Sequence, residues 1–187
     1  MSKRLTTLGA DDTVRVSFQL GKRGGVLAKT PMTNQQRKRV VAIGEILWDI
    51  IGEEMHIGGA PFNFAFHTSQ FGHDAWLISR VGNDPLGREI LSTARQMGLS
   101  PDHIQMDLSK PTGTVNVSVN LFGEPQYEIA ENVAWDYIAA TQAQLELVRS
   151  ADVLWFSTLA QRNRASRSAI RQMLETARSA RSDVLIV

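Results

Sequence analysis

The sequence contains no cysteine in 187 residues. This absence excludes disulfide bonds, a thiol nucleophile and a thiolate metal site. No stretch reaches the roughly 18 consecutive apolar residues that indicate a membrane-spanning helix. Lys3 and Arg4 are followed by no apolar segment, so the start of the chain is not typical of a secretory signal. We therefore expect a cytoplasmic protein with no membrane partner.

Several motifs of nucleotide and metal chemistry are also missing. There is no Gly-x-x-x-x-Gly-Lys-Ser/Thr phosphate loop. There is also no Gly-x-Gly-x-x-Gly, which argues against the dinucleotide-binding domain of an oxidoreductase. Asp84 could be a metal ligand, but aspartate directly before proline is more typical of a helix N-cap. No metal site is predicted, because the histidines also lack the spacing of one: His56, His67, His73 and His103.

The net charge of +1 hides an asymmetry between the two ends of the chain. Residues 1–39 contain nine Lys or Arg and two Asp, whereas residues 40–187 contain eleven Lys or Arg and seventeen Asp or Glu. A basic arm can bind nucleic acid or an anionic membrane, but a solvated extension is the simpler interpretation. We predict that residues 1–38 are a basic, disordered leader and that no nucleic acid is bound.

Buried strands and amphipathic helices alternate along residues 39–187. Val40–Gly44 is a continuous apolar run of the kind that a parallel sheet buries on both faces. Strands that alternate with helices favour βαβ units and a parallel sheet. Further strands are expected at 75–81, 104–107, 153–156 and 184–187, with helices over about 61–71, 85–97, 141–149 and 165–180.

Residues 114–129 have a different pattern. Apolar and polar residues alternate strictly from Thr114 to Leu121, and Gly123 and Pro125 then turn the chain. This pattern predicts an antiparallel hairpin with one face in water. Alternation alone leaves open whether the hairpin is a plain surface feature or has a function.

The most informative stretch is residues 56–72. Gly58 and Gly59 allow backbone conformations and close approaches that a side chain would block. Pro61 suits the first helical position. Asn63 then falls in the first turn of the predicted helix, where free backbone N–H groups favour oxygen-rich ligands.

An aspartate follows the first buried strand. Asp49 is expected beyond the carboxyl end of Val40–Gly44, which is where open α/β sheets bind their ligands. From the residue alone, a turn or cap role is also open. Trp135 is open in the same way: it could stack on a ligand, but a lone tryptophan is more often part of the core.

Four motifs occur in a fixed order along the chain: Gly44–Asp49, Gly58–Ala65, Val81–Gly87 and Pro111–Thr114. Together they resemble the ribokinase-like (PfkB) sugar kinases, in the form typical of fructokinases. The first is similar to the family's first strand with its sugar-binding aspartate, and the second to its N-terminal signature. The third is similar to a loop before a helix, and the fourth to the start of the lid strands. The resemblance covers residues 39–187 and stops short of the family's C-terminal half.

The resemblance implies an α/β, ribokinase-like fold. A Rossmann-type, mostly parallel sheet would be flanked by helices and carry a small antiparallel β lid, with the fold truncated at its C-terminus. The lid would comprise residues of about 50–58 and 112–130. The implied reaction is phosphorylation of a sugar hydroxyl by ATP with Mg²⁺, with fructose favoured by the Gly-Gly-Ala-Pro form. The implied partners are a small sugar and a second copy that dimerises through the lid.

The resemblance also assigns site residues. The implied sugar-binding residues are Asp49, Gly58, Gly59 and Asn63. The aspartate would accept hydrogen bonds from two sugar hydroxyls. Where some family members place an acidic sugar ligand, this chain has Leu159 and Ala160. Gln161 and Arg162 are therefore considered as substitutes.

The residues that transfer the phosphoryl group are not found. In the family, a Gly-Ala-Gly-Asp segment supplies the catalytic base and the anion hole, and no such segment occurs in this sequence. No residue present supports ATP or Mg²⁺ binding. The stop inside the strand at 184–187 suggests a truncated chain. We expect the N-terminal portion of a fructokinase-like kinase, inactive alone. The alternative is a non-catalytic remnant that binds a sugar or dimerises through its lid.

Overall fold

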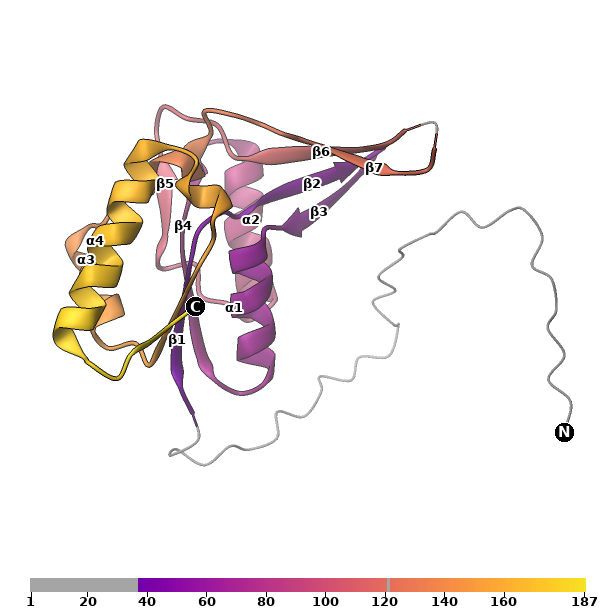
Figure 1. Ribbon diagram of the computed structural model, residues 1–187. Coiled ribbons are helices and arrows are strands. Elements are labelled where there is room, and N and C mark those ends of the chain that lie inside the picture. Colours follow the sequence, from indigo (N-terminus) through magenta and orange to yellow (C-terminus); the bar gives the residue numbers. More distant parts are fainter. Residues whose placement is uncertain (1–36, 121) are drawn as a thin grey trace, which may run out of the picture.

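The computed structural model describes residues 37–120 and 122–187. These residues form a large sheet with helices on both faces and a small sheet that projects from one end of it (Figure 1). The predicted leader lies almost wholly outside the described residues. Within the described part, no helix combines the length and the apolar character needed to cross a membrane.

The large sheet has five parallel strands in the order β5-β4-β1-β8-β9. β1 lies at its centre, where Ile43 is opposite Ile78 of β4 and Phe156 of β8. Apolar strands of this kind need cover on both faces, and the α/β fold with a mostly parallel sheet is confirmed. The strands are β1 Arg39–Ile43, β4 Asp74–Gly82, β5 Ile104–Asp107, β8 Val153–Phe156 and β9 Leu185–Ile186.

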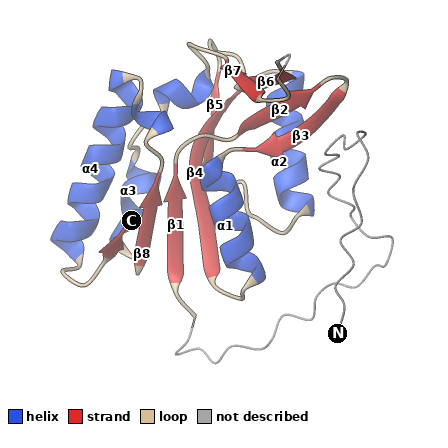
Figure 2. Cartoon of the chain, turned by 45° about the vertical axis from the view of Figure 1, so that its right-hand side comes forward, coloured by secondary structure: helices blue, strands red, loops and turns tan. Residues whose placement is uncertain are grey.

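Two hydrophobic clusters hold the helices against the two faces of this sheet (Figure 2). α1 and α2 cover one face, where Phe62 and Ile90 pack with Leu77. α3 and α4 cover the other face, where Ile170 packs with Leu154. The helices are α1 Ala60–Gln70, α2 Pro85–Gln96, α3 Gln142–Arg149 and α4 Arg164–Ala180, with short 3₁₀ helices η1 Ala134–Tyr137 and η2 Leu159–Gln161.

The starts of α2 and α3 differ in how they are capped. Asp84 accepts a hydrogen bond from the Gly87 backbone N–H at 2.8 Å, which confirms its role as the N-cap of α2. Thr141 precedes α3, but its side chain makes no capping hydrogen bond. The Thr141 hydroxyl is directed at the side chain of Gln144 instead of the backbone.

The small sheet has four strands in the order β3-β2-β6-β7. β6 and β7 are antiparallel, which confirms the predicted hairpin. Asp49 lies within β2, opposite His56 of β3 and Val115 of β6. Gly44, with φ of 150°, ends β1 and the chain then enters this second sheet, so Asp49 follows the carboxyl end of β1 as a residue of β2. The strands are β2 Leu47–Ile51, β3 Glu54–Gly58, β6 Thr114–Val119 and β7 Pro125–Ile129.

Candidate functional site

The carboxyl ends of β1 and β8 meet the start of α1 in one tightly packed junction. The Ser157 backbone N–H donates to the carbonyl oxygen of Ile43 at 3.0 Å, and the Gly44 N–H donates to that of Ile78 at 3.0 Å. A Cβ on Gly44 would lie 2.6 Å from Cγ of Pro61 in α1. Only glycine fits this position, and its close packing holds α1 at the edge of the sheet where open α/β folds bind ligands.

The start of α1 has no side-chain cap. Gly59 precedes the helix with φ of 106°, and a Cβ there would lie 2.5 Å from the carbonyl oxygen of Glu45. The first helical hydrogen bond runs from the Asn63 N–H to the Gly59 carbonyl oxygen at 3.0 Å, and the Asn63 side chain is exposed. The N–H groups before Asn63 have no intrahelical partner, so this end of the helix has a partial positive charge.

The carboxylate of Asp49 lies against Gly58, two residues before the first residue of α1. A side chain on Gly58 would collide with Oδ2 of Asp49. Burial raises the pKa of the Asp49 carboxyl, and the charge of His56 opposes that shift. The structure thus brings Asp49, Gly58 and Gly59 to the start of α1, with Asn63 in its first turn.

The side chains of Gln161 and Arg162 are held by protein partners at the wall of the junction. The Arg162 guanidinium forms two bonds to Asp136, at 2.7 and 2.9 Å, and lies 4.0 Å from the ring centroid of Trp135. The Gln161 amide donates to the Ser157 carbonyl oxygen at 3.2 Å. Trp135 is fully buried, as the core interpretation predicted.

The structure adds Glu45, which sequence reasoning did not single out. Its side chain is 3% exposed although it directly follows Gly44 at the edge of the sheet. Burial raises the pKa of the Glu45 carboxyl, against hydrogen bonds from the Ser157 hydroxyl and the Ala60 N–H and the charge of Arg162. A carboxylate directly after a buried strand was the available signal, since buried acids with shifted pKa values cluster at functional sites.

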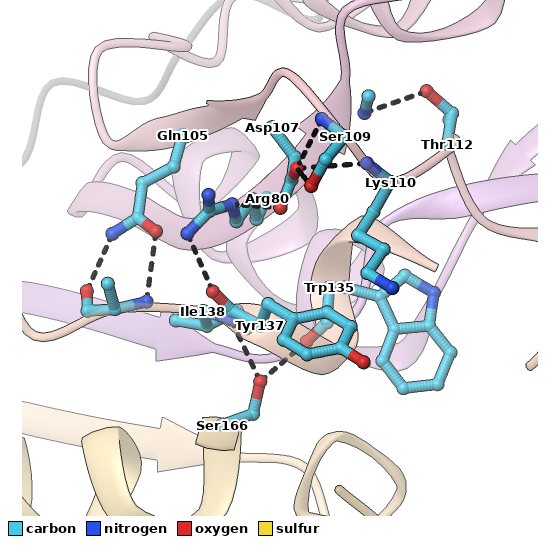
Figure 3. Close-up of polar contacts among 12 residues, drawn as sticks. Arg80, Gln105, Asp107, Ser109, Lys110, Thr112, Trp135, Tyr137, Ile138 and Ser166 are labelled. Carbon is cyan, nitrogen blue, oxygen red and sulfur yellow. Dashed lines mark hydrogen bonds and ion pairs between the residues drawn. The ribbon is translucent and has the colours of Figure 1, made fainter. Parts of the chain in front are cut away.

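A hollow of about 570 Å³ lies elsewhere, between the ends of β4 and β5, η1 and α4. Figure 3 shows the polar contacts beside it. Arg80 pairs with Asp107 at 2.9 Å and donates to the Tyr137 carbonyl oxygen at 2.8 Å. The Lys110 ammonium donates to Asn132 at 2.7 Å. The charged groups of this hollow are thus bound to protein partners, and its lining does not include the predicted site residues.

Comparison with known proteins identifies the family. The model of the pfkB family carbohydrate kinases matches residues 37–186. An uncharacterized sugar kinase of Pyrococcus horikoshii is 27% identical over 147 residues, which are 73% of this chain and 47% of the relative. Its solved structure matches with a TM-score of 0.71 at 26% identity and covers 79% of this chain and 51% of that chain. The same protein has been solved in complex with ATP.

Two fructokinases are among the similar proteins. Fructokinase-1 of Zea mays is 25% identical over 157 residues, which are 77% of this chain and 49% of the relative. The structure of Halothermothrix orenii fructokinase matches with a TM-score of 0.68 at 27% identity and covers 75% of this chain and 54% of that chain. The chain spans about half the length of the curated relatives it matches. With both sheets and the start of α1 inside the matched residues, the chain belongs to the pfkB family of carbohydrate kinases.

Proposed function

We propose that this chain binds a free sugar, with fructose as the first candidate, and forms the sugar-binding side of an ATP-dependent sugar kinase. Asp49 accepts hydrogen bonds from two neighbouring hydroxyls, because a carboxylate has several acceptor positions and no donor. Gly58 and Gly59 let the sugar approach the backbone. Asn63 offers an amide donor and a carbonyl acceptor. The fructokinases among the relatives favour fructose.

One observation carries this proposal: a half-buried carboxylate lies beside an uncapped helix start at the carboxyl edge of a parallel sheet. Asp49 is partly withdrawn from water, so hydroxyl donors from a sugar would replace lost hydration. A hydrogen bond to a charged group contributes about 1.5–3 kcal/mol. Gln161 and Arg162 do not contact the sugar in this proposal. They stabilise the residues beside the site, because Gln161 donates to Ser157 and Arg162 donates to Asp136.

ATP is the phosphoryl donor that a carbohydrate kinase implies, and Mg²⁺ would accompany it. The donor set of residues 37–120 and 122–187 includes no group of three or more His, Asp or Glu side chains that could hold a metal ion. The uncapped start of α1 could attract a phosphate, but the Glu45 carboxyl lies beside its first N–H. These residues do not fit ATP or Mg²⁺, so the proposed role is confined to the sugar.

Titration of the purified chain with fructose tests the proposal. We expect saturable binding in isothermal titration calorimetry. The backbone amide NMR shifts should be concentrated at Asp49 and Gly58–Asn63. A polyol without a ring, such as mannitol, is the matched ligand control. Absence of saturable binding, or shifts confined to the hollow beside Arg80 and Tyr137, would contradict it.

The chain alone is expected to show no appreciable kinase activity. Removal of a general base costs about 10²–10⁴ in rate, and removal of anion-stabilising donors costs about 10²–10³ more. The measurement is coupled detection of ADP formation with fructose and a panel of other sugars, with a full-length fructokinase as the positive control. Turnover that requires both fructose and Asp49 would refute this expectation.

Self-association through the small sheet is a second candidate function, favoured by one exposed apolar face. Val117 is opposite both Ile51 of β2 and Tyr127 of β7, so these side chains share the face that carries Asp49. Ile51, Val119 and Tyr127 are 51%, 68% and 64% exposed. Exposed apolar patches of this kind mark interaction surfaces. We propose that this face pairs with the same face of a second copy.

A charge reversal on this face tests the dimer. The double variant Val119→Glu/Tyr127→Glu should sediment as a monomer in analytical ultracentrifugation, because four carboxylates would be brought together across a two-fold interface. The control is Ser118→Glu/Gln126→Glu, which changes the opposite face of the same two strands and should leave the dimer intact. A wild-type chain that stays monomeric at all concentrations would rule out the dimer.

A further inference from the structure

Glu45 is a buried acid beside the start of α1, and the sugar-binding proposal does not use it. Glu45 is 3% exposed, and its Oε2 atom is buried without a hydrogen-bond partner among the described residues. A buried carboxylate that is incompletely hydrogen-bonded opposes folding. Such a group is more typical of a functional site than of a stabilising contact.

Three structural elements surround this carboxylate. The Ser157 side chain, after β8, and the Ala60 backbone, at the first position of α1, lie close enough to this carboxyl to lower its pKa against the larger effect of burial. Ser157 Oγ also accepts from the Leu159 N–H at 3.0 Å, which holds the Ser157 side chain in place beside β8. The turn before α1 packs on the same residue, since a Cβ on Gly59 would lie 2.5 Å from the Glu45 carbonyl oxygen. Glu45 is therefore held between the end of β8 and the first residues of α1.

The guanidinium of Arg162 does not neutralise Glu45. Arg162 is close enough for its charge to act on Glu45. Its guanidinium, however, is bound through two nitrogens to Asp136, at 2.7 and 2.9 Å. Two carboxylates thus share one guanidinium. The ionised cluster of Glu45, Asp136 and Arg162 has a net negative charge beside the first turn of α1.

We propose that Glu45 is a specificity-determining residue that makes this site accept uncharged sugars and exclude phosphorylated ones. A bare helix N-terminus attracts phosphate through its free N–H groups and its partial positive charge. The carboxyl of Glu45 lies beside the Ala60 N–H, so its negative charge opposes the binding of an anion at the free N–H groups of this helix start. A sugar hydroxyl can still donate to Asp49, whereas a phosphate group meets repulsion. The inference rests on the proposed sugar site and names the class of sugar that it takes.

The test compares ligand selectivity in the wild-type chain and in Glu45→Gln, which keeps the shape of the side chain and removes its charge. The ligands are fructose, fructose 6-phosphate and inorganic phosphate, measured by calorimetry and by the NMR shifts of the Ala60 and Phe62 amides. Glu45→Met is a second charge-free variant. The control is Glu53→Gln, which removes an exposed charge from the turn between β2 and β3.

We expect the affinity for fructose 6-phosphate and phosphate, relative to fructose, to rise about tenfold or more in both Glu45 variants. That is the scale of removing one unit charge near the ligand in a medium of intermediate dielectric constant. The Glu53 control should keep the wild-type ratio. Continued exclusion of both phosphate ligands by both Glu45 variants would overturn the inference. Failure of the wild-type chain to bind fructose would instead overturn the proposed function, because phosphate binding by the variants is measured independently.

Discussion

Replacement of Asp49 by alanine is expected to abolish measurable fructose binding. The carboxylate is the proposed acceptor for two sugar hydroxyls, and each such charged hydrogen bond contributes about 1.5–3 kcal/mol. Since about 1.4 kcal/mol corresponds to a factor of ten in affinity, the loss should exceed about a hundredfold. Asp49→Asn keeps one acceptor without the charge and should give an intermediate loss. Calorimetric titration with fructose measures both variants.

The matched control for this experiment is Asp102→Ala, which removes an exposed carboxylate from the loop before β5. It should bind fructose like the wild-type chain. Neither Asp49 variant should lose thermal stability through the missing charge. Burial raises the pKa of Asp49 above its ordinary value, so the ionised form destabilises the fold as the pH rises through that range. Unchanged fructose affinity in Asp49→Ala would remove the basis of the proposed site.

The pH dependence of sugar binding follows from the same carboxylate. The ionised form accepts the hydroxyls, and its pKa is raised mainly by burial. Binding should therefore strengthen as the pH rises through the range in which Asp49 ionises. On acidification it should weaken at a higher pH than an ordinary aspartate would give. Asp49→Asn should not show this weakening.

Replacement of Arg162 by alanine is expected to be the most destabilising single change in the described part of the chain that we propose to test. Asp136 is 2% exposed and would lose both bonds to the guanidinium. Removal of one partner from a buried ion pair costs about 3–5 kcal/mol, because the other charge stays buried and unpaired. The variant would also lose the contact over Trp135. The measurement is the free energy of unfolding from urea denaturation.

Two further variants separate this mechanism from a general effect of losing an arginine. Arg171→Ala removes an exposed side chain from α4, the helix that follows Arg162, and should change the free energy of unfolding by no more than about 0.5 kcal/mol. Arg162→Met combined with Asp136→Leu removes both charges and should recover much of the loss. A change below about 1 kcal/mol in Arg162→Ala would show that Asp136 does not depend on its partner.

Local patterns in the sequence predicted the elements around the site well, because their causes are local. The run at residues 104–107 forms β5 as predicted, and Asp84 caps α2 through the N–H of a residue three positions later. The Gly-Gly-Ala-Pro turn starts α1 for a similar reason, since Gly59 adopts a positive φ that other residues avoid. The family followed from motifs of the same kind.

The sequence by itself determined the parallel α/β fold, the helix that starts at the glycine turn and the family resemblance, because each depends on residues within a few positions of one another. Only the tertiary structure decided that Asp49 belongs to a second sheet, since β2 pairs with β6 more than sixty positions later. It also decided that Glu45 is buried and that Arg162 is bound to Asp136. Burial and ion pairing depend on the packing of β1, β8, α1 and η1 against one another. These elements are far apart in the sequence, so no local pattern predicts their contacts.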